Sequence, residues 1–397
     1  MQKIYSAVVW FIVTLFVIYA FCLNTAAAVF SEAIKTSLHA DSVQVSIAAG
    51  AFILGFALMQ IPAGYLLDKF NARFVVSGGI LLLALGNVMI SFANNLVIFT
   101  LSNFIQGLGA AFAFIAAAVL ISQWFETNKF PILFGLTQML SCILAGVIHY
   151  YFTIILTTHT WNAIYQGLAV YGFVLLILAL MFVKSPAGYQ RDSNTSLLGS
   201  LCTVLKNRQI ILCSLAAATS FGVLLAYASL WYVQVQSYYG VESLQRVLIS
   251  SMIFIGIGVG TPLLGWISNR VQSRVMVIHV TLVLGVMALL LGLYLPHFNI
   301  DTLVIIKTIS FFIGFFLSGS MLFYTMVSEI ATDSTRGVAI SVLNTAVFLF
   351  NTLMLFVPYL FITVISKEFF TYLWILPFCT LFSILLVYFI KDTYTAK

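Results

Sequence analysis

Charged residues are scarce in this chain. Lys, Arg, Asp and Glu make up 7% of its 397 residues, whereas a soluble domain carries roughly 25%. Such a chain cannot cover a water-facing surface with charge, and its mean hydropathy of +1.11 agrees. The sequence therefore predicts an integral membrane protein whose main partner is the lipid bilayer.

Cysteine pairs and catalytic motifs are also missing from the sequence. The five cysteines are scattered and form no CxxC pair, which gives no disulfide framework and no metal site. The sequence has no HExxH, no GxSxG on a suitable turn, no paired membrane aspartates and no ATP-binding motif. The net charge of +6 comes from Lys and Arg in short loops. We expect no cofactor, no metal, no nucleic-acid partner and no enzyme activity.

Long apolar runs are what the sequence has in abundance. Most exceed 18 residues, the length of a membrane-spanning helix, so we expect helices rather than barrel strands. The run from Val8 to Phe30 is too long for a typical signal peptide and is taken as an uncleaved first helix. Twelve spans are predicted, at about 8–30, 43–67, 74–94, 96–123, 131–155, 162–183, 209–237, 247–268, 275–295, 301–327, 337–365 and 369–390.

One connection is much longer than the others. Residues 184–208 separate six predicted helices from six more, so we predict bundles at 1–183 and 209–397 joined by this linker. A short surface helix is expected at 196–205. Most Lys and Arg fall on one side if the N-terminus is cytoplasmic, and the positive-inside rule then places both termini and the linker in the cytoplasm. We expect a monomer in the cell membrane, the inner membrane of a bacterium.

A polar phrase occurs twice between predicted helices. The first copy runs from Gly64 through Asp68 to Arg73, and the second from Gly265 through Asn269 to Arg274. Every matched position lies 201 residues further along, about half of the chain. The repeat indicates two similar halves with the same hairpin in each.

This phrase resembles the hairpin motif of the major facilitator superfamily, Gly-x-x-x-Asp-Arg-x-Gly-Arg-Lys, between helices 2 and 3. The residues from Gln60 to Gly64 and from Arg336 to Ala339 are similar to the same family. The resemblance implies an all-α fold of two pseudo-symmetric six-helix bundles around a central cavity. It also implies a site near mid-membrane that is exposed to one side at a time.

The hairpins are predicted to act in gating. Asp68 ends helix 2 on the side where helix 11 begins, and a carboxylate at a helix N-terminus is stabilised by about 0.3–1 kcal/mol. We therefore expect Asp68 to bind helix 11 in a closed state, and the uncharged Asn269 to form a weaker counterpart. The alternative is that these charges only fix topology. The gating candidates are Gly64, Asp68, Lys69, Arg73, Gly265, Asn269, Arg270, Arg274 and Arg336.

Ionisable groups within membrane helices are costly and usually functional. Lys307 lies ~9 Å along helix 10 from Asp301 at 1.5 Å per residue. It would either attract an anion in the cavity or extend its long side chain to the membrane interface. Glu32 is either a proton or cation site or an interfacial charge near Lys35. His149 either takes up a coupled proton or is a buried neutral side chain.

Uncharged polar residues favour a polar cavity on the helices that line it in the family. Asn103 stands where the family often has an Arg, which puts proton relay through that Arg in doubt. Interhelical hydrogen bonds, worth about 0.6 kcal/mol each, are the alternative for any one residue. The substrate-binding candidates are Lys307, Asn24, Tyr19, Asn103, Gln106, Gln138, Tyr227, Trp231, Tyr324 and Asn344.

The sequence thus predicts a secondary or facilitative transporter of a small polar solute, such as an organic anion, an amino acid or a short peptide. Transport would be driven by the gradient of the solute itself or by a coupled proton or cation. We expect uptake rather than export. An exporter of a metabolite or siderophore-like compound, and a non-transporting sensor with a transporter fold, are the alternatives.

Overall fold

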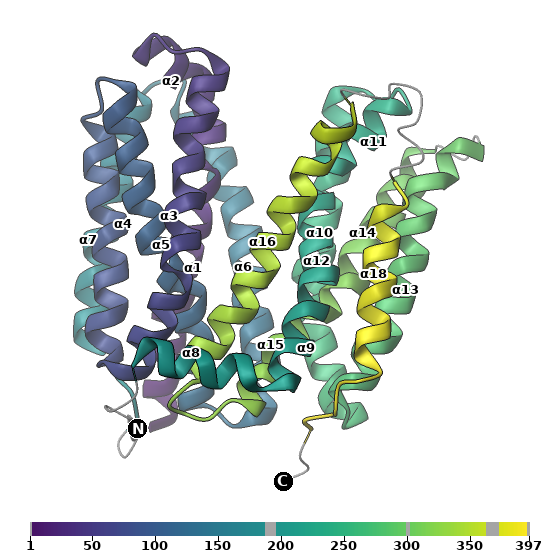
Figure 1. Ribbon diagram of the computed structural model, residues 1–397. Coiled ribbons are helices and arrows are strands. Elements are labelled where there is room, and N and C mark those ends of the chain that lie inside the picture. Colours follow the sequence, from purple (N-terminus) through teal and green to yellow (C-terminus); the bar gives the residue numbers. More distant parts are fainter. Residues whose placement is uncertain (1, 187–195, 299–301, 363–372, 395–397) are drawn as a thin grey trace. The chain divides into compact units, whose positions relative to one another are not determined.

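The protein is described by a computed structural model that covers residues 2–186, 196–298, 302–362 and 373–394. Every regular element in these ranges is a helix (Figure 1). Eleven of the described helices are long and apolar enough to cross a membrane. A shorter apolar helix, α18 (Ile375–Val387), lies in the twelfth predicted span. The start of that span and the end of the one before it lie partly outside the described residues.

In the first half of the chain α3 to α7 match the predicted spans to within a few residues, whereas α1 begins at Gln2 instead of about residue 8 and the short helix α2 was not predicted. Asp41, Asn71, Asn95 and Thr160 accept a hydrogen bond from the first turn of the helix that follows each of them. The helices are α1 (Gln2–Val29), α2 (Ser31–Leu38), α3 (Ser42–Lys69), α4 (Ala72–Ser91), α5 (Leu96–Trp124), α6 (Phe130–Ile155) and α7 (Trp161–Phe182). A 3₁₀ turn, η1 (Thr127–Lys129), precedes α6.

Helices in the second half are less regular. The predicted span 209–237 is α9 (Arg208–Ala217), α10 (Val223–Ala226) and α11 (Tyr232–Tyr238), joined by the π-helical stretches η2 (Ala218–Gly222) and η3 (Tyr227–Trp231). A 3₁₀ turn, η5 (Ser318–Met321), divides α14 (Leu303–Leu317) from α15 (Leu322–Ile330). The remaining long helices are α12 (Ser243–Val271), α13 (Arg274–Tyr294) and α16 (Arg336–Ile362).

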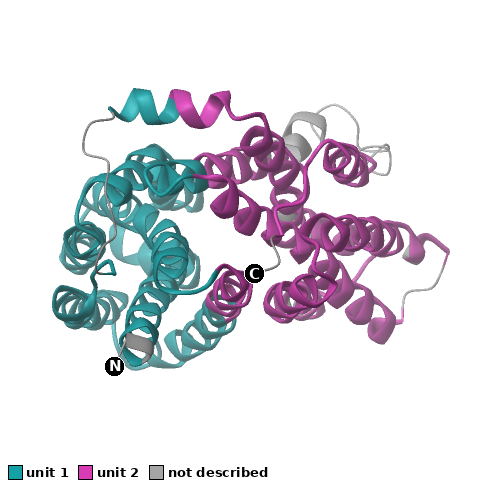
Figure 2. Ribbon diagram, turned by 90° about the horizontal axis from the view of Figure 1, so that it is seen from below, with its two compact units in different colours: residues 1–126, 140–201, 332–341 teal, residues 127–139, 202–331, 342–397 magenta. Residues whose placement is uncertain are grey.

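The chain forms two compact units, coloured separately in Figure 2. Unit 1 contains residues 1–126, 140–201 and 332–341, and unit 2 contains residues 127–139, 202–331 and 342–397. Each unit thus includes a short segment from the other half of the sequence: the first turns of α16 in unit 1, and those of α6 in unit 2. The division into bundles at 184–208 remains a prediction.

The linker contains the helix α8 (Leu197–Lys206), where a surface helix was expected. Ser200 and Val204 are buried, whereas Leu198 and Leu205 are 72% and 50% exposed. The helix therefore has one packed face and one apolar face that is open. Residues 187–195 of the linker lie outside the described ranges.

Candidate functional site

Asp68, at the end of α3, binds the first turn of α16 within unit 1. The side chain is 2% exposed. Its Oδ1 accepts a hydrogen bond of 2.7 Å from the Gly337 amide, and its Oδ2 accepts one of 2.9 Å from the Val338 amide. These amides have no partner inside their own helix, and the N-terminal end of the helix dipole favours a negative charge there. This contact was expected from the sequence, and its role in gating remains a prediction.

Two glycines allow α3 and the start of α16 to approach this closely. A Cβ atom built on Gly64 would collide with the carbonyl oxygen of Gly337, and one built on Gly337 would collide with that of Gly64. At positions 64 and 337, therefore, only glycine fits between the two helices. Arg336, beside this contact, forms an ion pair with Asp333, with Nη1 2.6 Å from Oδ1.

The other cations of the first hairpin, residues 64–73, have different surroundings. Arg73 Nε donates to the Val183 carbonyl oxygen, 3.2 Å away at the end of α7. Trp124 Nε1 likewise donates to the Lys184 carbonyl at 2.8 Å. These bonds satisfy carbonyl groups that a helix end leaves without partners. Lys69 lies over the Tyr65 ring, 5.3 Å from its centroid.

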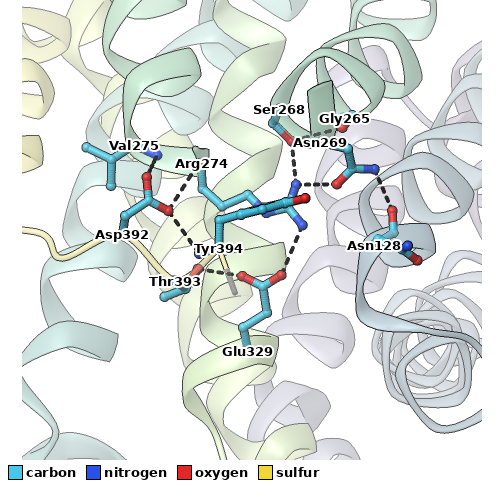
Figure 3. A network of polar contacts seen from close by, with 10 residues as sticks. All are labelled: Asn128, Gly265, Ser268, Asn269, Arg274, Val275, Glu329, Asp392, Thr393 and Tyr394. Carbon is cyan, nitrogen blue, oxygen red and sulfur yellow. Dashed lines mark hydrogen bonds and ion pairs between the residues drawn. The ribbon is translucent and has the colours of Figure 1, made fainter. Parts of the chain in front are cut away.

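The second hairpin, residues 265–274, differs in chemistry from the first. Asn269 Nδ2 donates to the Asn128 carbonyl oxygen at 2.5 Å, just before α6, and Asn269 Oδ1 accepts from Arg274 Nη1 at 2.6 Å (Figure 3). A Cβ atom on Gly265 would lie 2.8 Å from the Pro131 carbonyl oxygen, so α12 and α6 also pack closely. Arg270 lies 5.3 Å from the centroid of the Trp266 ring. Asn269 therefore donates a hydrogen bond to a backbone carbonyl group, whereas Asp68 accepts hydrogen bonds from backbone amides.

Arg274 is the centre of a buried polar network in unit 2. Its side chain is 1% exposed, and that of Glu329, at the end of α15, is 7% exposed. Arg274 Nη2 lies 3.1 Å from Glu329 Oε1, and Nη1 donates to Ser268 Oγ at 2.6 Å. The guanidinium also lies 5.1 Å from the centroid of the Tyr394 ring. Glu329 is not among the residues predicted from the sequence, although an acid near the end of a predicted span was a usable signal.

The segment after α18 completes this network, as Figure 3 shows. Asp392 accepts hydrogen bonds from the Ser273 hydroxyl and from the amides of Arg274 and Val275, at 3.1 and 3.2 Å for the amides. Thr393 donates to Glu329 Oε2. Partial burial opposes ionisation of Asp392, but the hydrogen bonds that its carboxylate accepts outweigh this effect and hold its pKa below the usual value. This segment was not predicted from the sequence, because nothing in the order of its residues indicates where it folds back.

Several substrate-binding candidates in unit 1 are hydrogen-bonded within that unit. The Tyr19 hydroxyl donates to the Leu168 carbonyl oxygen at 2.8 Å and accepts from Asn87 Nδ2 at 2.6 Å. Gln106 Nε2 donates to Asn87 Oδ1 at 2.9 Å. Asn103 donates to its own helix, at the Phe99 carbonyl, and Asn24 is exposed. The chain Tyr19–Asn87–Gln106 therefore joins α1, α4, α5 and α7.

The candidates in unit 2 are more varied. The Tyr324 hydroxyl donates to Asn344 Oδ1 at 2.6 Å, and Trp231 Nε1 donates to the Met354 carbonyl oxygen at 2.8 Å. Tyr227, on the π-helical stretch η3, is fully buried, and its hydroxyl has no hydrogen-bond partner among the described residues. Gln138 is buried. Lys307 is half-buried and forms no ion pair with another described residue.

The two coupling candidates differ in their surroundings. His149 is half-buried, and its Nε2 lies 3.1 Å from the Cys22 carbonyl oxygen and 3.2 Å from Thr25 Oγ1. The Glu32 side chain is 83% exposed and pairs with Lys35 at 3.1 Å. The pairing of Glu32 matches the interfacial alternative that its sequence allowed.

The described part of the chain is all-α, with eleven membrane-length helices and a repeated interhelical hairpin, and this defines the class of multi-pass membrane proteins. The sequence profile of the Major Facilitator Superfamily matches residues 12–354, so the chain belongs to this superfamily. The predicted family and fold class are thereby confirmed.

Curated relatives share only part of their length with the chain. It is 25% identical over 172 residues to the multidrug resistance protein MdtL of Escherichia coli O9:H4 (strain HS), a match over 42% of this chain and 44% of that protein. MdtL of Shigella flexneri matches over the same shares at the same identity. The chain thus spans less than half the length of these relatives.

Solved structures match the fold over nearly the whole chain. The proton:xylose symporter XylE, bound to 6-bromo-6-deoxy-D-glucose, aligns with a TM-score of 0.76 at 14% identity, covering 99% of this chain and 97% of that one. The E. coli fucose:proton symporter FucP aligns with a TM-score of 0.73 at 16% identity, covering 98% of each chain. At these identities the likeness shows the fold alone.

Proposed function

We propose that the chain is a secondary transporter that moves a small polar solute across the cell membrane by alternating access. The observation that carries this proposal is the Asp68 carboxylate on the Gly337 and Val338 amides. Both bonds are made to a helix N-terminus whose amides water can satisfy equally well once the helices separate. The contact is therefore strong while water is excluded from it, and breaking it costs little free energy once water can reach the amides. A gate that must form and break in each cycle needs this combination.

The proposed substrates are an organic anion, an amino acid or a short peptide. Lys307 supports this choice, because it is a half-buried cation without an ion pair among the described residues. A buried cation favours a ligand with a negative group, since an unpaired charge in a membrane helix is costly. The Tyr227 hydroxyl, buried and without a partner in the described part of unit 2, offers a hydrogen bond to such a ligand.

A coupled proton is proposed as the driving ion, with His149 as the candidate for its site. The structurally similar XylE and FucP are proton symporters, and an imidazole changes charge near physiological pH. Glu32 suits this role less, because it is largely exposed and already paired with Lys35. We propose a monomer in the bacterial inner membrane with both termini in the cytoplasm.

Uptake of labelled solutes into proteoliposomes, with and without a pH gradient, tests the proposal. We expect uptake of at least one anionic or zwitterionic solute. Lys307→Ala should lower its binding at least tenfold, whereas Lys307→Arg, which keeps the charge, should retain it. Lys35→Ala, which removes a cation that is already paired with Glu32, is the matched control. If Lys307→Ala binds as tightly as the parent, the substrate class is wrong; if no solute crosses, the sensor alternative holds.

Export is the second candidate, and the match to the multidrug resistance protein MdtL favours it. Inverted membrane vesicles distinguish the two directions. An exporter would accumulate an apolar dye or a metabolite inside these vesicles when a proton gradient is applied. An importer of polar solutes would leave such compounds outside.

A further inference from the structure

The two hairpins bind different partners with their matched arginines. Arg73 of the first hairpin donates to the Val183 carbonyl group at the end of α7. Arg274 of the second is buried and meets the carboxylate of Glu329 at 3.1 Å. The first hairpin thus carries its own functional acid, Asp68, whereas the acids around the second hairpin come from α15 and from the segment after α18.

Residues 391–394, the C-terminal segment, are fixed at their start. Gln209 Nε2 donates to the Phe389 carbonyl oxygen at 3.2 Å, and the Lys391 amide donates to Gln209 Oε1 at 2.9 Å. One side chain at the start of α9 therefore binds the backbone on both sides of Ile390. This double contact directs the following residues towards the second hairpin.

Three side chains of this segment then contact the hairpin or its acid. Asp392 binds the Ser273 hydroxyl and the first two amides of α13, as a residue that caps a helix does. Thr393 donates to Glu329, and the Tyr394 ring lies against the guanidinium of Arg274. A carboxylate at a helix N-terminus and an aromatic face over a cation are both favourable contacts. Tyr394 thus contacts the guanidinium directly, Asp392 binds the Arg274 amide, and Thr393 binds the acid that pairs with Arg274.

We propose that Asp392, Thr393 and Tyr394 are positioning residues for the second hairpin: they hold Arg274 against Asn269 and thereby fix the Asn269 amide on Asn128. The proposal rests on the transporter function proposed above and on the gating role predicted for this hairpin. The segment supplies a negative charge next to a hairpin that has the uncharged Asn269 where the first hairpin has Asp68. Without it, Arg274 would keep Glu329, and α13 would keep its N-cap Ser273 but lose the bonds from its first two amides to Asp392.

The test compares two shortened forms of the full protein in lipid nanodiscs. A stop after Lys391 removes the three contacting residues, and a stop after Tyr394 removes only the residues that follow them. Hydrogen exchange of residues 272–280 and 126–135 reports the two sides of the hairpin contact without any substrate. We expect about tenfold faster exchange, or more, after the first truncation and wild-type exchange after the second.

Point variants keep the test decisive if the shorter chain fails to fold. Asp392→Asn and Tyr394→Leu should each speed exchange at 272–280, whereas Tyr394→Phe, which keeps the ring, should not. Unchanged exchange in Asp392→Asn and Tyr394→Leu would overturn the proposal. Faster exchange with an unaltered transport rate would also overturn it, because the segment would then be merely structural. A wild-type protein that transports nothing refutes the transporter function instead, while the exchange data still decide the positioning role.

Discussion

Asp68 accepts a 2.7 Å hydrogen bond from the backbone amide of Gly337, a residue 269 positions further along the chain. The bond is buried, it is assisted by charge, and it ends at a helix N-terminus. Its partner is a backbone group, which every residue at position 337 except proline would supply. The space at position 337 is what requires glycine, because a Cβ atom there would collide with the Gly64 carbonyl oxygen.

Asp68→Asn should weaken the contact between α3 and α16. The amide keeps one acceptor oxygen, but its NH₂ group then faces an amide donor, and the charge is lost. Hydrogen bonds to charged groups contribute about 1.5–3 kcal/mol, so we expect exchange of the first turn of α16 to rise by about ten- to hundredfold. Hydrogen exchange of residues 336–345 measures this effect.

Asp41→Asn is the matched control for that variant. Asp41 also accepts from a helix amide, that of Gln44, but it is exposed and caps its own helix. We expect a small effect, confined to the start of α3. If both variants change exchange at 336–345 equally, or neither does, then the Asp68 contact does not hold the helix.

Gly64→Ala and Gly78→Ala should change stability in opposite directions. The new methyl group at position 64 would meet the Gly337 carbonyl and Ser341, whereas nothing lies within 4 Å of it at position 78. Overpacking costs about 1–3 kcal/mol, while alanine in an open helical position gains up to about 1 kcal/mol over glycine. Thermal unfolding should show a lower melting temperature for Gly64→Ala and an equal or higher one for Gly78→Ala. A higher melting temperature for Gly64→Ala would contradict the close approach.

Sequence could predict the spans and the first hairpin but not the second network. The apolar runs are as long as a bilayer requires, so α3 to α7 begin and end close to the predicted residues, whereas the short helix α2 was not predicted. Asp68 could be recognised because its motif indicates which helix it ends and on which side of the membrane that end lies. Glu329 and Asp392 belong to no repeated phrase, and their role depends on a backbone that folds back after α18. The hydrogen bonds of Tyr19 and Gln106 could not be predicted either. Both residues bind Asn87, and no spacing rule in the sequence connects Asn87 to them.

The Arg274–Glu329 pair should be far more sensitive to mutation than an exposed pair. Removing one partner leaves the other as an uncompensated buried charge, which costs about 3–5 kcal/mol. Arg274→Ala and Glu329→Ala should both lower thermal stability by this order. Arg274→Lys should recover only part of it, because an ammonium cannot reach Ser268, Asn269 and Glu329 together.

Lys35→Ala is the comparison for this prediction. Its exposed pair with Glu32 is worth about 0–1 kcal/mol, so thermal unfolding should barely change. Equal losses for Lys35→Ala and Arg274→Ala would show that burial adds nothing to the Arg274 pair.

Asp392 should make the stability of the second hairpin depend on acid pH. Its pKa is held below the ordinary value of about 3.9, because the hydrogen bonds from Ser273 and from the Tyr394, Arg274 and Val275 amides outweigh partial burial. A lowered pKa means that the stabilisation is complete above the ordinary value and is lost as the pH falls through the lowered one. The difference in melting temperature between the wild type and Asp392→Asn should therefore be constant from pH 7 to about 5 and shrink below about 4. Ser273→Ala removes one of the bonds to the carboxylate and should move this loss to higher pH. A difference that stays constant down to pH 3 would mean that the charge of Asp392 does not contribute to these contacts.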